Sequence, residues 1–324
     1  ILNCGGEIHF NKKLTDFSIS KDRITTVHCA DGDSFTCAHL ILATGHSARD
    51  IFYLFHKKGL QIEAKPFALG VRIEHPQSII DSARYHCDIR DPYLPPASYS
   101  LVQQVEQQGV FSFCMCPGGI IAPASTAEGE LVVNGWSPSK RNNPFANSGT
   151  VVTIGHKDAL AYLKKNKELT VKETDPLLLL HFQQEVEKKA WQAGGGQLVA
   201  PAQRMVDFVN RKTSSTLPPN SYLPGVHTVN LPDILPPFVS EALRGALPEF
   251  GKKMKGYYTN EAILVATESR TSSPVRIPRN ERLQHPQIKN LYPCAEGAGY
   301  ASGIVSAAMD GENVAAQIIA ELVY

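Results

Sequence analysis

The stretch from Asn290 to Tyr324 constrains the fold more than any other part of the chain. The apolar run from Leu291 to Cys294 predicts a short strand, and a glycine-rich segment, 296–303, follows it. A helix is then expected to begin near Gly303. Its apolar residues recur at the three-and-four spacing of an α-helix: Ile304, Ala307, Ala308, Val314, Ala315, Ile318, Ile319 and Leu322. This order of strand, glycine turn and helix is typical of α/β proteins.

The glycine turn suggests a ligand site. Glycines before a helix let backbone N–H groups approach a ligand without an intervening Cβ, and the helix dipole favours negative charge there. An ionised Glu296 is suited to accept hydrogen bonds from sugar hydroxyls. A nucleotide-type cofactor would therefore lie against Glu296, Gly297, Ala298, Gly299, Tyr300, Gly303 and Ile304. On these residues alone, a turn with a purely structural role is an equally good interpretation.

Composition narrows the possible functions. The 324 residues, 43% of them hydrophobic, are enough for one large domain or two ordinary ones. The formal charge of +1 gives no overall attraction to nucleic acid or to an anionic membrane, so a small-molecule partner is favoured. Seven scattered cysteines fit a reducing, intracellular setting. With no signal peptide and no apolar run of about 20 residues, a soluble protein is expected.

The first part of the chain predicts an antiparallel meander followed by a parallel strand. Short β-branched or alternating runs are separated by polar turns: Glu7 to Phe10, Leu14 to Ser20, Ile24 to Cys29 and Ser34 to Thr36. The apolar run His39 to Gly45 suits a strand buried on both faces. A helix is expected next, capped by Ser47 and ended by Gly59.

These segments carry a resemblance. Thr36 and the run 40–45 (LILATG), after a meander, resemble the second signature of two-dinucleotide-binding-type flavoproteins, whose closing strand carries an acidic residue, as at Glu296. The chain is still more similar to an uncharacterised family of FAD-dependent (NAD/FAD-utilizing) dehydrogenases found in bacteria and plastid-bearing eukaryotes. Four segments carry this likeness: 65–76 (KPFALGVRIEHP), 111–119 (FSFCMCPGG), 268–277 (ESRTSSPVRI) and 297–300 (GAGY).

The resemblance implies a mixed α/β (α+β) fold. Residues 1–58 and 286–324 would form part of an FAD-binding Rossmann-like domain of the glutathione reductase type, and residues 59–285 an inserted, mainly antiparallel substrate domain. The cofactor would be FAD, bound by Thr44, Gly45 and His46 as well as by the glycine turn, with NAD(P)H as a candidate electron donor. The location would be the cytoplasm in a bacterium or the plastid stroma in a photosynthetic eukaryote.

One departure from the family is clear. Such flavoproteins begin with a strand, a Gly-x-Gly-x-x-Gly turn and a helix that hold the FAD pyrophosphate. Here Gly5 and Gly6 follow no strand and open no helix, and 194–196 (GGG) comes after a helix. We therefore expect the chain to lack an N-terminal segment, either as a fragment or as a truncated gene product. The strand edge left open would favour self-association.

The middle of the chain reads as mixed strands and helices. Strands are expected at Phe67 to Glu74, Ser98 to Gln104, Val110 to Cys114, Leu131 to Gly135 and Thr150 to Ile154. Helices are expected at Pro176 to Ala193, capped by Asp175, and at Phe238 to Phe250, although Pro248 counts against its last turn. The Ser-, Pro- and Asn-rich stretch Thr213 to Pro237 resembles a linker.

Four residues in this region are candidates for catalysis. Arg72 and His75 are close together on one strand and could bind an anion or move a proton; a surface strand end is the alternative. Arg270 and Arg276 flank a Thr/Ser run and could face the flavin or a substrate carboxylate; the alternative is an ordinary ion pair between Glu268 and Arg270.

Cys114 and Cys116 suggest thiol redox chemistry, but thiols one residue apart form a strained disulfide, and small buried side chains are the more common role. No set of ligands has the spacing of a metal site. The function expected is that of a soluble FAD-dependent oxidoreductase acting on an anionic small molecule. The alternative is a non-catalytic ligand-sensing or interaction scaffold. Flavin-dependent tRNA modification is disfavoured because basic blocks are lacking.

Overall fold

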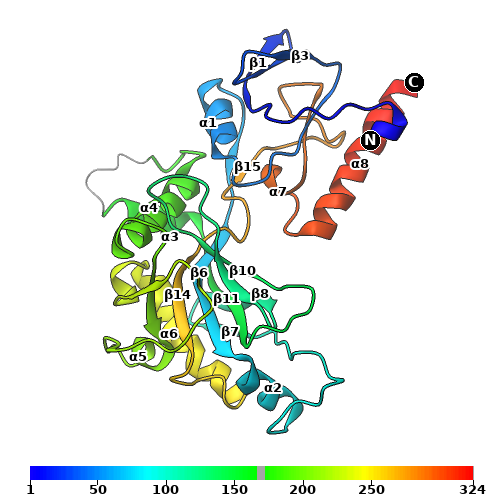
Figure 1. Ribbon diagram of the computed structural model, residues 1–324. Coiled ribbons are helices and arrows are strands. Elements are labelled where there is room, and N and C mark those ends of the chain that lie inside the picture. Colours follow the sequence, from blue (N-terminus) through cyan, green and yellow to red (C-terminus); the bar gives the residue numbers. More distant parts are fainter. Residues whose placement is uncertain (166–171, 324) are drawn as a thin grey trace. The chain divides into compact units, whose positions relative to one another are not determined.

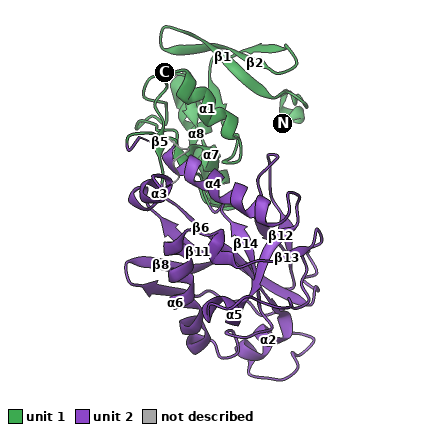
Figure 2. Ribbon diagram, turned by 90° about the vertical axis from the view of Figure 1, so that its left-hand side faces the viewer, with its two compact units in different colours: residues 1–65, 174–177, 272–324 green, residues 66–173, 178–271 purple. Residues whose placement is uncertain are grey.

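The computed structural model describes residues 1–165 and 172–323 and shows a mixed α/β protein with two compact units (Figures 1 and 2). Unit 1 comprises residues 1–65, 174–177 and 272–324, and unit 2 comprises residues 66–173 and 178–271. The chain therefore leaves unit 1, forms unit 2 and returns. The main boundaries lie at 65/66 and 271/272, whereas the sequence suggested 58/59 and 285/286.

A seven-stranded sheet forms the centre of unit 2, in the order β13-β12-β14-β6-β11-β8-β7. Every pair is antiparallel except β12 with β13, which is parallel. A separate antiparallel pair joins β9 and β10. The strands are β6 (Phe67–Pro76), β7 (Val102–Val105), β8 (Gln108–Cys116), β9 (Ile120–Pro123), β10 (Val133–Trp136), β11 (Phe145–Ile154), β12 (Ala200–Arg204), β13 (Val226–Thr228) and β14 (Ile263–Glu268).

The sheet centre explains the apolar runs of the sequence. Strands β6, β11 and β14 are buried along almost their whole length, and Val and Ile suit such strands because their branched side chains pack well on a pleated surface. The strand predicted at Ser98 to Gln104 begins later, at Val102, and the one predicted at Thr150 begins earlier, at Phe145. Pairing with neighbours, rather than local composition, sets these ends.

Unit 2 contains the two predicted helices, α4 (Leu178–Ala193) and α6 (Pro237–Lys253), and further helices that the sequence did not indicate. The latter are α2 (Gln77–Tyr85), α3 (His156–Leu163), α5 (Met205–Val209) and the 3-10 turn η2 (Leu231–Asp233). In α4, Phe182 and Val186 are buried, and Glu185 forms an ion pair with Lys189 at 3.6 Å. Helix α6 continues past Pro248 to Lys253. The expectation that Pro248 would disturb the last turn was therefore wrong.

The stretch Thr213 to Pro237 is not a linker, because it belongs to unit 2. Ser221 is buried there and donates its backbone N–H to the Glu74 carboxylate at 2.7 Å. A second hydrogen bond runs from the Ser221 hydroxyl to the same carboxylate. A polar residue of this stretch therefore binds a buried carboxylate, and the stretch is not a solvent-exposed connection between domains.

The described part of unit 1 contains small sheets, three α-helices and one 3-10 turn. Its elements are η1 (Leu2–Cys4), β1 (Leu14–Ser20), β2 (Arg23–Cys29), β3 (Ser34–Thr36), β4 (Leu40–Leu42), α1 (Arg49–Lys57), β5 (Glu63–Ala64), β15 (Val275–Arg276), β16 (Leu291–Pro293), α7 (Ala295–Ala298) and α8 (Ile304–Val323). Strands β1, β2 and β3 form the predicted meander. Strand β5 pairs with β15, and β4 pairs with β16 in parallel.

Three predictions for unit 1 were wrong. Residues Glu7 to Phe10 form no strand, and their side chains are exposed. Strand β4 is short and not buried on both faces, because Ile41 is 42% exposed. Helix α1 begins at Arg49, and its N-cap residue is Ala48, not Ser47. Gly59 does follow the helix with φ +67°, a left-handed conformation that suits glycine.

Helix α8 forms where predicted, but only a narrow stripe of it is buried. Val314 is buried against Tyr292 and Cys294 of the β16 segment, and Ile318 packs on the same cluster. Ile304, Val305 and Met309 are exposed. The single parallel pair in the described part of unit 1 supports a mixed α/β fold; a Rossmann-like domain stays a prediction.

Candidate functional site

Two turns meet at one end of the parallel pair in unit 1. Because β4 and β16 run in the same direction, the residues after Leu42 and after Pro293 leave the same edge. The turns approach so closely that a Cβ on Gly297 would lie 2.8 Å from the backbone N and O of Gly45. Glycine at 297 is therefore a packing requirement.

A cavity of about 270 Å³ lies between these turns and the start of α8. Of the residues predicted to bind a cofactor, Gly45, Glu296, Gly303 and Ile304 line it. Sequence reasoning missed three small lining residues: Ala43, Ala295 and Ala307. The carboxylate of Glu296 lies 3.4 Å from the His46 ring nitrogen Nδ1. Thr44 is exposed and does not line the cavity.

The rest of the glycine turn faces β15. Gly299 has φ +84°, and a Cβ there would lie 3.0 Å from Lys65 Cδ and 3.3 Å from Arg276 Cα. The Ala298 carbonyl accepts a hydrogen bond from Ile277 N–H at 3.2 Å. The geometry gives Ala298 and Gly299 a positioning role, and their contact with a cofactor stays a prediction.

Tyr300 is held by two guanidinium groups. The Arg279 guanidinium lies 3.9 Å from the centre of its ring, and that of Arg276 lies 5.4 Å away, within the range of cation–π attraction. The Tyr300 hydroxyl also accepts a hydrogen bond from Arg279 N–H at 3.1 Å. The ring is therefore fixed beside the turn.

Arg276 is the predicted catalytic residue that lies beside the glycine turn in unit 1. Its Nε is buried and has no hydrogen-bond partner among residues 1–165 and 172–323. Burial lowers the pKa of Lys65, and the nearby charge of Arg276 lowers it further. Two cations in a partly buried region favour the binding of an anionic group.

An ion pair that the sequence did not reveal ties α8 to the turn. Arg279 and Asp310 form two contacts, at 2.6 and 3.0 Å, and Asp310 also accepts the Ala295 N–H at 2.7 Å. Burial, then the Asp310 carboxylate, raises the pKa of the Cys294 thiol to about 11. Cys294 is therefore a neutral thiol at pH 7. Asp310 interrupts an apolar stripe, which is the one signal that could have revealed the pair.

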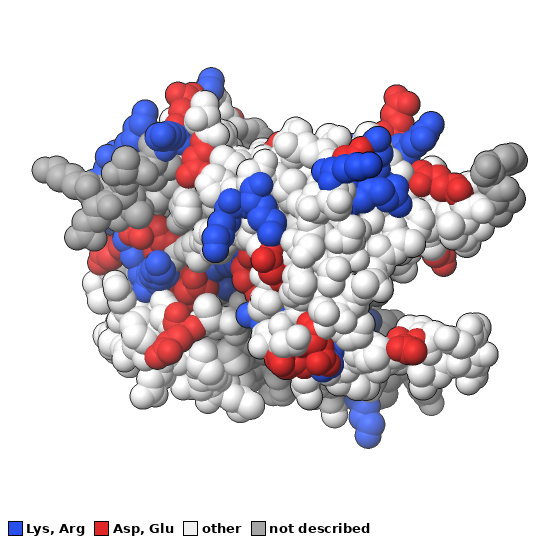
Figure 3. All heavy atoms as spheres, turned by 90° about the horizontal axis from the view of Figure 1, so that it is seen from above, with Lys and Arg blue, Asp and Glu red and all other residues white. Residues whose placement is uncertain are grey.

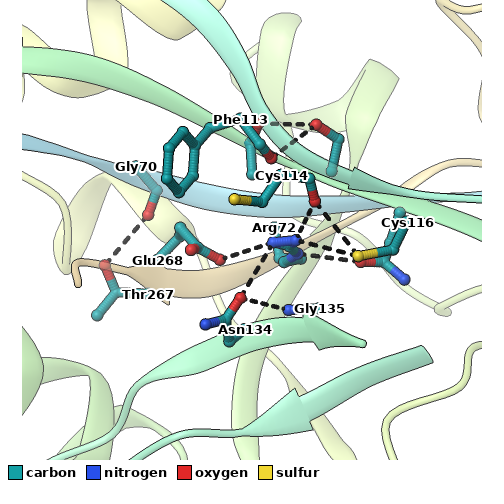
Figure 4. A network of polar contacts seen from close by, with 12 residues as sticks. Gly70, Arg72, Phe113, Cys114, Cys116, Asn134, Gly135, Thr267 and Glu268 are labelled. Atoms are coloured by element: carbon teal, nitrogen blue, oxygen red, sulfur yellow. Dashed lines mark hydrogen bonds and ion pairs between the residues drawn. The ribbon is translucent and has the colours of Figure 1, made fainter. Parts of the chain in front are cut away.

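Arg72 lies in unit 2 at the centre of a buried polar network (Figure 4). Its guanidinium pairs with Glu268 at 3.3 Å and donates to Asn147 Oδ1 at 3.0 Å and to the Cys114 carbonyl at 2.7 Å. A longer contact of 3.9 Å reaches Cys116 Sγ. A fully buried cation needs such partners because desolvation is costly.

The neighbours of Arg72 on β6 are also buried. Burial lowers the pKa of His75 to about 4, so its ring is neutral at pH 7, and Nε2 lies 2.8 Å from the Tyr257 carbonyl. Burial raises the pKa of Glu74 to about 7, although hydrogen bonds from Ser221 and the charge of Arg72 oppose the shift. The proton-transfer role of His75 stays a prediction.

Arg270 belongs to a second buried network in unit 2. Its guanidinium pairs with Glu130 and Glu187, each at 3.2 Å, and donates to the Thr126 hydroxyl. The alternative interpretation, an ion pair between Glu268 and Arg270, is wrong, because Glu268 pairs with Arg72. A joint action of these residues on one substrate stays a prediction for Arg72, Arg270 and Arg276.

The metal and thiol hypotheses concern the arrangement of His, Cys, Asp and Glu side chains. Within residues 1–165 and 172–323, no group of His, Cys, Asp and Glu is arranged to hold a metal ion. No disulfide bond joins any of the seven cysteines. Cys116 Sγ donates to the Cys114 carbonyl at 3.3 Å, and Cys114 has φ +44°. The backbone at Cys114 therefore departs from the conformation of a regular strand.

The surface has charges of both signs. On the face in Figure 3, Lys and Arg side chains lie close to Asp and Glu side chains in several places. This agrees with 32 basic and 31 acidic residues in the whole chain. None of the helices in the described residues combines the length and apolar character that a membrane crossing needs.

Comparison with known proteins gives two findings. Residues 66–271 match a family model described as "FAD-dependent protein, C-terminal domain-like"; this range begins and ends with unit 2. An uncharacterised protein of Clostridium beijerinckii is 41% identical over 323 residues, which is 98% of this chain and 58% of the relative. The chain thus spans somewhat more than half the length of that relative, which is bacterial. A plastid location stays a prediction.

Proposed function

Since the chain belongs to the family of FAD-dependent proteins with this C-terminal domain, we propose that it is part of an oxidoreductase that transfers hydride between FAD and a small anionic molecule. The family match is the observation that carries the proposal. The match covers unit 2, and the cavity between the two glycine turns lies in unit 1. The proposal therefore assigns the cofactor contacts to unit 1 and substrate contacts to unit 2.

The volume of the cavity would admit part of the proposed cofactor. Its volume of about 270 Å³ is below the roughly 300–1,000 Å³ of pockets that hold a whole drug-sized ligand. One end of FAD could enter it, while the remainder would need residues outside it. The space stays open because Ala43 and Ala307 have only a methyl side chain and Gly303 has none.

The residues around the cavity suit a flavin chemically. When bound, FAD supplies the hydride acceptor or donor. The start of α8 presents backbone N–H groups and the positive end of the helix dipole, which stabilise negative charge. Glu296 can accept hydrogen bonds from hydroxyl groups. Arg276 can orient an anion with its fork of N–H donors.

The candidate residues for substrate binding in unit 2 already have partners. Arg72, His75 and Arg270 are buried, and Arg72 and Arg270 already bind carboxylates. They are best suited to hold the sheet and loops that present other groups. A catalytic role for them would require a change in their partners when substrate binds.

Ala307→Leu tests the cavity directly. A leucine would project into the cavity, whereas Ala316→Leu adds the same side chain at an exposed position of α8 that does not line it. FAD binding to the chain would be titrated by flavin fluorescence, and the purified Clostridium beijerinckii relative would be examined for a visible flavin band. Thermal unfolding of both variants would check that they fold.

We expect the relative to carry FAD and this chain to bind it weakly. Ala307→Leu should weaken binding about tenfold or more, because overpacking typically costs 1–3 kcal/mol, and Ala316→Leu should leave it unchanged. The cavity assignment fails if the two variants bind FAD equally well. The absence of flavin from both proteins would favour the non-catalytic scaffold.

A further inference from the structure

A second and larger hollow lies in unit 2, lined by helix α2 and by the end of α6. Figure 1 shows where these two helices lie. Its volume of about 750 Å³ lies within the range of pockets that hold small molecules, roughly 300–1,000 Å³. Ser78, Ser82 and Arg84 line it from α2, and Lys252, Lys253 and Lys255 line it from α6 and the following turn. None of these residues belongs to the proposed flavin site.

The charge of this hollow differs from that of the whole chain. Its lining contains four cations, Arg84 and three lysines, against one carboxylate, Asp88. The chain as a whole has 32 basic and 31 acidic residues. Like charges gathered in one concave place repel one another and raise the local concentration of anions.

Two of the cations are available to a ligand. Lys252 pairs with Glu249 at 2.6 Å, and Lys253 donates to the Val102 carbonyl. In the part of the chain that the structure describes, Arg84 and Lys255 are exposed and have neither an ion pair nor a side-chain hydrogen bond. A guanidinium fork, an ammonium group and serine hydroxyls together are typical donors to phosphate oxygens.

Helix stabilisation explains part of this arrangement. Arg84 lies in the last turn of α2, and Lys252 and Lys253 lie in the last turn of α6, where cations interact favourably with the helix dipole. That effect acts within each helix and gives no reason for both ends to share one hollow. Lys255 lies beyond the end of α6, so the dipole explains it least.

We propose that this hollow binds a polyvalent phosphate compound of up to nucleotide size. Helix C-termini present carbonyl groups, which cannot donate to an anion, so the side chains must supply the affinity. Binding should therefore be strongly salt-dependent, because exposed charges are screened. Occupancy should also stabilise the folded chain, since a ligand that binds only the native state raises the unfolding temperature.

The test is a calorimetric titration of the 324-residue chain with pyrophosphate, ADP and citrate at low and high salt. The pocket variant is Arg84→Glu/Lys255→Glu. The control variant, Lys140→Glu/Lys157→Glu, changes the net charge by the same amount at exposed positions of unit 2 outside the hollow. Circular dichroism would confirm that both are folded, and flavin is absent from every measurement.

Pyrophosphate and ADP should bind, more tightly than citrate, and salt should weaken them. The pocket variant should lose about tenfold in affinity or more, because each reversed charge replaces an attraction by a repulsion, and the control should lose less than about twofold. Equal losses in both variants, citrate binding as tight as that of pyrophosphate, or no binding at millimolar ligand would overturn the proposal. None of these outcomes bears on FAD.

Discussion

At the scale of single residues, strand β6 places a titratable pair inside unit 2. His75 and Glu74 are consecutive and both buried, and burial moves their pKa values in opposite directions, to about 4 and about 7. At neutral pH the histidine is neutral and the carboxyl group is partly protonated. Their effects on stability oppose each other as the pH changes.

The pH dependence of Glu74 can be isolated with Glu74→Gln. The folded-state pKa is raised from 4.5 to about 7, so folding favours the protonated form; its contribution is complete below pH 4.5 and is lost as the pH rises through 7. Relative to Glu74→Gln, the wild-type chain should lose about 3 kcal/mol of unfolding free energy between pH 4.5 and pH 7. Urea titrations of both proteins across this range measure the difference, and parallel pH profiles would contradict it.

At the scale of elements, β10 crosses close to the guanidinium of Arg72. A Cβ on Gly135 would lie 2.3 Å from Arg72 Nη2 and 2.4 Å from Asn147 Oδ1. The buried network thus depends on a glycine in a neighbouring strand. Figure 4 shows Gly135 and Asn134 on this strand, facing Arg72.

Gly135→Ala should therefore destabilise the protein by about 2 kcal/mol or more, because the methyl group displaces a buried charge from its partners. Gly109→Ala in β8 is the matched control, since a Cβ there lies 3.8 Å from its nearest neighbour. That change should be neutral or stabilise by about 0.5 kcal/mol, because alanine loses less entropy than glycine in a strand. Denaturation midpoints give both values, and similar midpoints would refute the close approach.

At the scale of the whole molecule, β4 and the exposed residues of α8 leave apolar surface on unit 1. Among the described residues β4 pairs only with β16, and Ile41 is exposed. Ile304, Val305 and Met309 of α8 are exposed as well. An unpaired strand edge is a template for pairing with another chain.

We expect the 324-residue chain to self-associate through β4 as its concentration rises. Ile41→Lys should reduce this association, since a charge on an edge strand opposes pairing. Ile89→Lys makes the same change at an exposed position outside the strands of unit 2 and should have no effect. Light scattering over a range of concentrations provides the measurement; a monomeric wild-type chain would show that the edge does not pair.

The amino-acid sequence by itself determined the elements whose signals are local. The meander, α4 and the beginning of α8 follow from alternation, helical spacing and glycine ends, which act over a few residues. The family resemblance came from segments spread over most of the chain. The sequence also indicated a ligand site at Glu296 and Gly297, because the glycine turn and the helix that follows it are adjacent in sequence.

The tertiary structure decided what depends on distant partners. Glu268 pairs with Arg72 and not with Arg270, because the sheet brings β6 and β14 side by side. The polar stretch after Thr213 became part of unit 2 because Ser221 binds Glu74, 147 residues away in sequence. Only the fold gathers Arg84 and Lys255 around one hollow. Such contacts join residues that no local pattern connects, so their chemistry appears only once the chain has folded.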